Sequence, residues 1–244
     1  MWDVTVDLVL GSVCAVCGRP GRVLCRSCRA ALPRAGAPAW PTPTPDGLVV
    51  PFAAGAYDAA LRALVNAHKE RRAFALARPL GQVLAAVVAD LLLEVGVGRG
   101  ADEPGRVALV PVPSRPTVVR ARGHDPLLRV ARHAASGLRR GGRDVVVHRL
   151  LRPRRSVRDQ AGLGARDRAA NLAGSLQAAP AVAGGPRLVV VDDVLTTGAT
   201  AREAQRALED AGHEVLGIGT VAATRRRTGP DQGPRSLPLS LLGD

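Results

Sequence analysis

The sequence predicts an α/β protein in which helices flank a parallel sheet. Short apolar runs typical of buried strands alternate along the chain with longer runs whose apolar residues recur at helical spacing. Strands alternating with helices favour parallel pairing. The 244 residues are 46% hydrophobic, which is enough to bury a sizeable core. This length fits one large domain, or one medium domain with a smaller one.

The expected strands are apolar runs rich in Val and Leu. They are Leu48–Ala53, Arg106–Val112, Asp144–Leu150, Leu188–Val191 and Glu214–Ala222. The run Arg152–Arg168 is polar, basic and contains glycine, so we expect a long loop or mobile flap there.

The expected helices lie between these strands. Asp125 suits the N-cap of one helix, with Pro126 as its first residue, and Gly212 suits the end of another. A catalytic pairing of His124 with Asp125 is conceivable, but neighbours in sequence rarely face each other. The ranges are Arg26–Leu32, Tyr57–His68, Ala73–Val95, Pro126–Arg140 and Thr200–Ala211.

Composition divides the chain into four parts. Residues 1–32 form a cysteine-containing knuckle, and 33–47 form a proline-rich segment that predicts a stiff, exposed linker. Residues 48–224 form the α/β domain, and 225–244 are rich in Gly and Pro, which predicts a disordered tail.

The N-terminus does not read as a secretory signal, because Asp3 and Asp7 precede any basic residue. The apolar run Val83–Ala89 stops at Asp90 and is too short to cross a bilayer. We therefore expect a soluble, cytoplasmic protein without membrane insertion.

The four cysteines form two C-x-x-C pairs, Cys14 with Cys17 and Cys25 with Cys28. Such pairs place four thiolates around a tetrahedral ion, which predicts a structural zinc site without an open position. Two disulfides or a redox dithiol are the alternatives, although a reducing cytosol disfavours disulfides.

The net charge is +13, and Lys69 is the only lysine among 34 basic residues. Preference for Arg over Lys suggests a GC-rich genome, but that bias does not explain the excess of basic over acidic residues. The excess is compatible with an anionic partner such as phosphate or nucleic acid. Lys69 is either required as lysine or a chance survivor.

The segment Leu188–Thr200 carries the clearest chemistry. An apolar strand delivers Asp192 and Asp193 at its carboxyl end, where ligands bind in open α/β sheets. The following loop and the helix N-terminus suit a phosphate, while the acidic pair suits hydroxyl groups beside it. The loop residues are Thr196, Thr197, Gly198, Ala199 and Thr200. The alternative is a core strand followed by a capped helix.

This segment resembles the phosphoribosyl-diphosphate (PRPP) motif of type I phosphoribosyltransferases, and nearly the whole chain resembles the ComF family. That family joins an N-terminal zinc-finger segment to a domain of the type I phosphoribosyltransferase fold. Besides the cysteines and the PRPP segment, the matching residues are Tyr57, Leu61, Leu64, Lys69, Val110–Pro113, Arg120–Gly123, Arg152, Gln160, Leu163, Arg168, Asn171 and Gly174.

The sequence departs from the family at two places. Arg122–Pro126 reads Arg-Gly-His-Asp-Pro where the family usually has Arg-Gly-Phe-Asn-Gln, and Glu70 replaces an aromatic residue after the lysine. The PRPP segment is intact, so these changes put in doubt only functions that depend on those side chains.

The resemblance implies a role for each candidate residue. Asp192 and Asp193 would meet the ribose hydroxyls and Mg²⁺, and the loop Thr196–Thr200 would bind the 5-phosphate. Ser114 and Arg115 would face pyrophosphate, where Arg is a good donor, although Arg115 is equally explained as a surface residue. Lys69 could stabilise the leaving group if folding brings it near.

Five arginines between Arg149 and Arg158 occupy the position of the flexible loop of that fold. They could close over PRPP, contact nucleic-acid phosphates, or form a solvated loop. Scarce aromatic residues, 2% of the chain, weaken a base-stacking binder.

Three functions follow. The first is a transferase that uses PRPP and an unidentified acceptor. The second is a non-catalytic PRPP sensor. The third is an accessory protein of natural competence that contacts single-stranded DNA or a DNA-uptake helicase. Glutamine-dependent chemistry is not expected, because every cysteine belongs to the knuckle.

Overall fold

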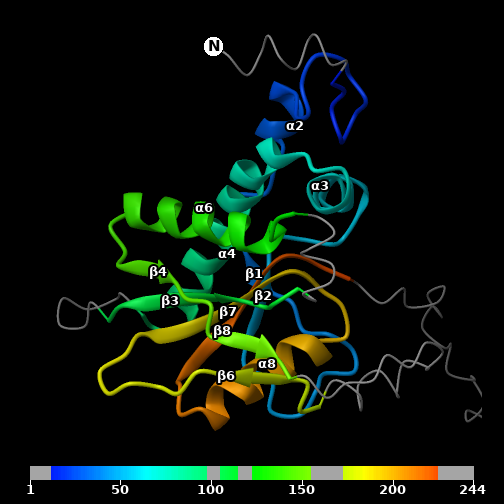
Figure 1. Ribbon diagram of the computed structural model, residues 1–244. Helices are drawn as coiled ribbons and strands as arrows, with labels where there is room; N and C mark the ends of the chain where they lie inside the picture. Colours follow the sequence, from blue (N-terminus) through cyan, green and yellow to red (C-terminus); the bar gives the residue numbers. More distant parts are fainter. Residues whose placement is uncertain (1–11, 98–104, 115–122, 155–172, 225–244) are drawn as a thin grey trace, which may run out of the picture.

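The computed structural model describes residues 12–97, 105–114, 123–154 and 173–224. Its main feature is a six-stranded sheet in the order β1-β2-β8-β7-β3-β4 (Figure 1). All neighbouring strands pair in parallel except β1 and β2. The strands are β1 (Ala37–Pro38), β2 (Pro51–Ala53), β3 (Val107–Pro111), β4 (Val145–Val147), β7 (Arg187–Leu195) and β8 (Val215–Ala223).

Helices cover both faces of this sheet, which confirms the α/β class. In Figure 1, α4 and α6 lie on one side and α8 on the other. The helices are α2 (Arg26–Ala30), α3 (Ala59–Glu70), α4 (Ala77–Glu94), α6 (Pro126–Arg140) and α8 (Ala199–Asp210), with a 3₁₀ turn at Phe74–Leu76. The bounds of α6 are those the sequence predicts.

Strand side chains alternate between two separate apolar cores. In β7, Val189 and Val191 belong to the core beneath α4 and α6, whereas Leu188 and Val190 belong to the core beneath α8. This is the two-residue period of a strand buried on both faces. It fixes which side of the sheet each residue of β7 faces.

The helix α4 is the central element of the first core. Phe74–Glu94 is long and apolar enough for a membrane span by length and composition, with a hydropathy of 1.6. However, 61% of that window is buried inside the protein. Packing against the sheet and α6 accounts for its apolar character.

The strand β7 is longer than the sequence suggests. It was expected to end at Val191, but pairing with β8 continues through Asp192, Val194 and Leu195. The acidic pair therefore lies within the strand and not after it. Parallel hydrogen bonding to β8 holds these polar residues extended.

A small hairpin corrects part of the expected loop. Arg152 and Pro153 lie in β5 (Leu151–Pro153), which pairs antiparallel with β6 (Leu176–Ala178). Residues 155–168 of the expected flap lie outside the described residues, as do the tail 225–244 and Arg115. The predicted domain boundaries stay a prediction.

The proline-rich segment is mostly exposed, as expected, but it is not a free linker. Gly36 N donates to Asp90 Oδ2 of α4 at 2.7 Å, and β1 extends the sheet edge beside β2. Pro41 is buried. We call residues 36–49 the proline strap, since they lie across the α/β unit.

Candidate functional site

An ion pair connects two distant parts of the chain at the carboxyl end of β7. Lys69 Nζ at the end of α3 contacts Asp193 Oδ2. The lysine side chain is 32% exposed and the aspartate side chain 16% exposed. Folding therefore brings the single lysine of the chain to the acidic pair.

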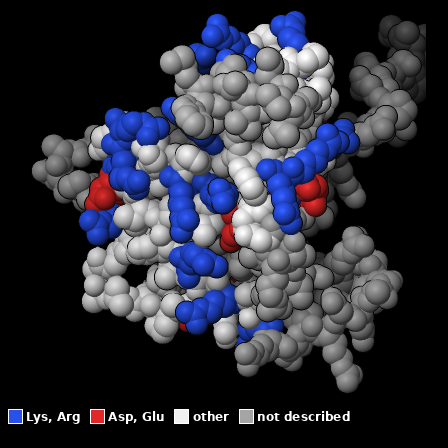
Figure 2. Space-filling model, turned by 45° about the horizontal axis from the view of Figure 1, so that its top comes forward, with Lys and Arg blue, Asp and Glu red and all other residues white. Residues whose placement is uncertain are grey.

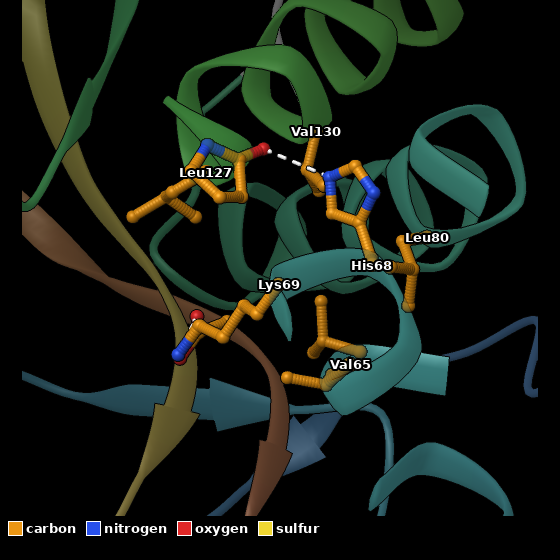
Figure 3. A pocket seen from close by; sticks show the side chains of 9 residues that line it. Val65, His68, Lys69, Leu80, Leu127 and Val130 are labelled. Carbon is orange, nitrogen blue, oxygen red and sulfur yellow. Dashed lines mark hydrogen bonds and ion pairs between the residues drawn. The ribbon is translucent and has the colours of Figure 1, made fainter. Parts of the chain in front are cut away.

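His68 fixes the end of α3 from which Lys69 extends. It is 2% exposed, and its ring nitrogens lie 3.2 Å from the carbonyl oxygens of Ala73 and Pro126. Figure 3 shows His68 and Lys69 leaving the same end of the helix in different directions. Burial holds the pKa of His68 below its ordinary value. The buried ring helps to fix the helix end from which Lys69 extends.

The two carboxylates are strongly coupled. Asp193 N donates to Asp192 Oδ1 at 2.8 Å. Burial, and repulsion from Asp193, raise the pKa of Asp192 to about 7. Lys69 acts in the opposite direction. The site therefore holds more negative charge than one lysine offsets, which favours a second cation or a hydroxyl donor.

The candidate phosphate loop, residues 196–200, follows directly. Gly198 caps α8 with a φ of +75°, in the left-handed region that favours glycine. Thr196 and Thr197 are exposed, whereas Gly198 is buried. Ala199 N lies 3.4 Å from Thr197 Oγ1. An open loop that leads into the N-terminus of a twelve-residue helix suits an anion.

Ser114 follows β3 at the same edge of the sheet. Pro111 pairs with Val191, and Val112 N donates to Val191 O at 3.0 Å. Ser114 comes two residues later, beside the strand end that carries the acidic pair. Arg115, its predicted companion, lies outside the described residues.

A small apolar pocket opens beside Asp193 and Lys69 (Figure 3). Its other lining residues come from α3, α4, α6 and β8. They are Val65, His68, Leu80, Pro126, Leu127, Val130 and Val221. The ion pair thus lies at the boundary between the charged site and the core.

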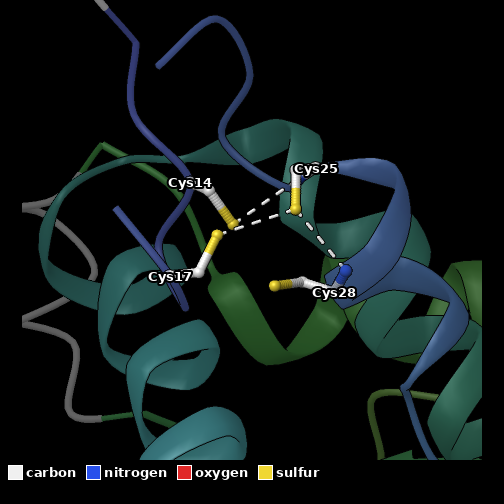
Figure 4. A group of neighbouring side chains, drawn as sticks. All are labelled: Cys14, Cys17, Cys25 and Cys28. Atoms are coloured by element: carbon white, nitrogen blue, oxygen red, sulfur yellow. Dashed lines mark hydrogen bonds between the residues drawn. The ribbon is translucent and has the colours of Figure 1, made fainter. Parts of the chain in front are cut away.

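The four predicted cysteine ligands come together at the N-terminal end of the described chain (Figure 4). Their sulfur atoms all lie within 4.8 Å of one another, and Cys17 Sγ lies 3.7 Å from Cys25 Sγ. Four sulfurs bonded to zinc at about 2.3 Å would lie about 3.8 Å apart. None of the four forms a disulfide. The cluster fits a tetrahedral metal ion.

Hydrogen bonds at this cluster favour a thiolate at Cys25. The Ser27 hydroxyl and the Cys28 amide lower the pKa of Cys25 to about 6. Cys14 and Cys25 belong to the same apolar core as α3 and α4. The knuckle is thus packed on the rest of the protein.

The sequence predicts one local feature near the site and misses others that the fold alone defines. Asp125 caps α6, accepting from Leu128 N at 3.1 Å, which confirms the capping role. His68 was missed, because its two carbonyl partners are defined only by the fold. Two prolines of the strap, Pro41 and Pro45, lie beside Gly198. The sequence did not predict this contact, because it too is defined only by the fold.

Comparison with known proteins identifies the segment that contains the acidic pair. The model of the phosphoribosyl transferase domain family matches residues 154–237. Adenine phosphoribosyltransferases from Prochlorococcus marinus strains MIT 9313 and MIT 9303 are 39% and 38% identical over 64 residues. Each match covers 26% of this chain and 37% of the relative, so it spans little more than a third of those proteins.

Two solved structures are also similar. Glutamine PRPP amidotransferase from B. subtilis has a TM-score of 0.34 at 19% identity, covering 61% of this chain and 26% of that one. Orotate phosphoribosyltransferase from Aeropyrum pernix has a TM-score of 0.28 at 22% identity, covering 66% and 76%. The fold and the matched segment together define an α/β protein that carries phosphoribosyl transferase domain sequence around its acidic pair.

Proposed function

We propose that this chain is a PRPP-dependent transferase of the ComF type, with an acceptor still to be identified. The observation that carries the proposal is the acidic pair of β7, followed by an open loop and helix α8, in the segment matched by the phosphoribosyl transferase domain. The ion pair of Lys69 with Asp193 supports it, because a cation beside the acidic pair suits a ligand that carries both hydroxyls and phosphates.

Each group has a distinct task in this proposal. The loop amides and the Thr196, Thr197 and Thr200 hydroxyls bind the 5-phosphate. Asp192 and Asp193 accept hydrogen bonds from the ribose hydroxyls and stabilise positive charge that develops on the sugar. Lys69 leaves Asp193 to neutralise departing pyrophosphate.

The acidic pair also fits Mg²⁺, which prefers carboxylate oxygens and substrate phosphates as ligands. Asp192 and Asp193 would hold the ion. Burial and repulsion from Asp193 raise the pKa of Asp192, and a bound cation would offset both effects. Bound Mg²⁺ supplies charge neutralisation at the pyrophosphate.

The cysteine cluster would hold structural zinc. The donors are four sulfurs without an open position, and their spacing matches tetrahedral coordination. Zinc content near one per chain, lost in Cys14→Ser, would support this role. A metal-free chain with an unchanged melting temperature would contradict it.

The central test measures pyrophosphate release from PRPP with a panel of nucleobases and amines. Asp193→Asn should lower the rate by at least about 100-fold, because it removes charge at the reacting sugar. Asp210→Asn is the matched control, since Asp210 is paired with Arg206 at the far end of α8. Equal loss in both variants would contradict the assignment.

Calorimetry with PRPP separates catalysis from sensing. Binding that requires Asp193, with no turnover of any acceptor, would favour the non-catalytic PRPP sensor. Absence of PRPP binding to the wild-type chain at millimolar concentration would reject both forms of the proposal.

A second candidate function rests on α6. The helix contains no Asp or Glu, and its Arg129, Arg132, Arg139 and Arg140 are exposed. Figure 2, which brings this side of the molecule forward, shows basic side chains with few acidic ones between them. Such a surface suits a polyanion, which supports single-stranded DNA as a partner in a competence role.

Salt dependence tests this second candidate. Binding of an oligonucleotide should weaken steeply between 50 and 200 mM salt and persist in Asp193→Asn. The double variant Arg132→Gln with Arg140→Gln should reduce the salt slope by about two. A salt slope that does not change in this variant would place any DNA contact elsewhere.

A further inference from the structure

The proline strap is fastened to α8 by side chains from the helix. Arg202 Nε donates to Asp46 O at 2.8 Å, and Gln205 Nε2 donates to Gly47 O at 2.9 Å. These partners are 156 and 158 residues apart in the chain. The first two turns of α8 therefore face the strap.

Gln205 makes the attachment specific. Its side chain is 2% exposed, and its Oε1 accepts from Val49 N at 3.0 Å while its Nε2 donates to Gly47 O. A buried amide that lost these partners would cost free energy, because its polar atoms would be left without hydrogen bonds. The register of the strap on α8 is thereby fixed.

Two prolines of the strap then contact the candidate phosphate loop. A Cβ placed on Gly198 would lie 3.0 Å from Pro41 Cγ and 3.3 Å from Pro45 Cδ and Cγ. Pro41 is buried, and its carbonyl accepts from Thr44 Oγ1 at 2.7 Å. The proline rings thus pack directly on the backbone of Gly198.

We propose that Pro41 and Pro45 are positioning residues that hold the phosphate loop in its anion-binding conformation. The inference rests on the proposed function, since it assigns these residues to the loop that binds the 5-phosphate. Neither proline is in the matched domain segment 154–237. The strap contributes no ligand to the phosphate; it acts through Gly198.

The physical reason is preorganisation of a backbone site. Amides bind an anion well only when their directions are fixed before the ligand arrives. A glycine with positive φ has wide conformational freedom. Rigid proline rings packed against it remove that freedom without offering a competing N–H donor.

The first test compares the affinity for ribose 5-phosphate by calorimetry in the full chain. The double variant Pro41→Ala with Pro45→Ala should bind roughly tenfold more weakly. Pro38→Ala is the matched control, because Pro38 is an exposed strap proline in β1, whereas the atoms nearest to a Cβ on Gly198 belong to Pro41 and Pro45. The titrations are made at a temperature at which circular dichroism shows all three proteins folded.

Attachment can be tested from the other side. Gln205→Ala removes the two hydrogen bonds that this side chain makes to Gly47 and Val49 of the strap, and it changes neither proline nor the loop. It should weaken ribose 5-phosphate binding in the same direction as the proline variants. Unchanged binding in both the proline variant and Gln205→Ala, with wild-type binding intact, would overturn the inference.

A double-mutant cycle with Gly198→Ala gives a readout that needs no ligand. The added methyl meets Pro41, so the fall in the urea midpoint should be smaller in the proline double variant than in the wild type. The strain of positive φ is present in both backgrounds and cancels. An equal fall in the urea midpoint in both backgrounds would show that the added methyl does not meet the prolines. Failure of the wild-type chain to bind either ribose 5-phosphate or PRPP would reject the proposed function instead, and the cycle would remain decisive for the contact.

Discussion

The two faces of the sheet use arginine in opposite ways. On α8, Arg206 contacts Glu203 and Asp210, and Arg202 contacts the strap. On α6 there is no acidic residue, and Arg129 lies 4.7 Å from the ring centre of Phe74. The same residue type is part of an internal polar network on one face and forms a positive surface on the other. The net charge of the sequence therefore does not predict where a positive surface lies, because some arginines are neutralised by acidic partners and others are not.

The strand β7 lies between these faces, and its two carboxylates point to opposite sides of the sheet. Asp193, on the side of α3 and α6, contacts Lys69. Alternation places Asp192 toward the opposite side, where its carboxylate is held by the Asp193 amide. One carboxylate has a cation and the other has a raised pKa. The following predictions compare the ion-paired α8 face, the two carboxylates of β7 and the basic α6 face.

The largest expected effect is on the α8 face, where Glu203→Ala should destabilise the protein by about 3 kcal/mol. Glu203 is 4% exposed, accepts from Leu176 N at 2.8 Å and contacts Arg206. Its removal leaves the buried Leu176 amide without its acceptor and takes from Arg206 one of its two carboxylate partners, the other being Asp210. Urea unfolding measures the change.

The pH dependence of this loss has a definite sign. Burial opposes ionisation, but Arg206 and the Leu176 amide hold the pKa of Glu203 below 4.5. The stabilisation is therefore present above that pH and is lost as the pH falls through the lower, folded-state pKa. A difference between the two proteins that grows with acidity would be inconsistent with this network.

The network also shows where sequence reasoning stops. The bounds of α6 and its Asp125 cap follow from local rules, because periodicity and a capping side chain act within a few residues. Glu203 fastens β6 of the β5–β6 hairpin. Arg152 and Pro153 of that hairpin were expected in a loop, and β6 was not predicted. Contacts between residues dozens of positions apart depend on the topology, which local patterns do not encode.

The candidate site also combines features that contiguous sequence predicts with contacts that depend on the fold. The acidic pair and its loop could be predicted, since a strand, two carboxylates and a glycine-containing turn are contiguous. The contact of Lys69 with Asp193 needed α3 to cross to the carboxyl end of β7. The sequence singled out Lys69 as the only lysine and, through the family resemblance, as a group that could stabilise the leaving group, but it did not predict the contact with Asp193. The strap was read from composition as a linker, because prolines describe local stiffness and not what the segment packs against.

The second prediction concerns Asp192. Asp192→Asn should raise the free energy of unfolding by about 1–2 kcal/mol at pH 8 in Mg²⁺-free buffer. The pKa of Asp192 is raised from 3.8 to about 7, so the folded state keeps a proton that the unfolded chain loses. The cost of the charge appears as the pH rises between these values and is complete above them.

Unfolding at pH 4 provides the internal control for Asp192→Asn. Most of the gain should vanish there, because the wild-type carboxyl is then protonated in the folded state and substantially so in the unfolded chain. A gain of equal size at both pH values would mean that the effect is not electrostatic.

A smaller effect is expected on the other side of β7. Lys69→Met should cost no more than about 1 kcal/mol, because the ion pair is partly exposed and solvent screens it. It should also raise the pKa of Asp192, since Lys69 is the nearby charge that lowers it. Carboxyl NMR titration measures that shift. Lys69→Arg keeps the charge and should leave the Asp192 pKa nearly unchanged; a shift as large as that in the Met variant would contradict the electrostatic origin.

The smallest effect belongs to the α6 face, where Arg140→Gln should change the free energy of unfolding by less than about 0.5 kcal/mol. Arg140 contacts the Ser136 hydroxyl at 2.7 Å and has no acidic partner within its helix. Loss of solvation, together with the charges of Arg78, Arg129 and Arg140, lowers the pKa of His133. Removing one of those charges should raise this pKa, and so should added salt in the wild type. An imidazole titration that responds to neither would show that the α6 arginines do not act on one another as a shared positive surface.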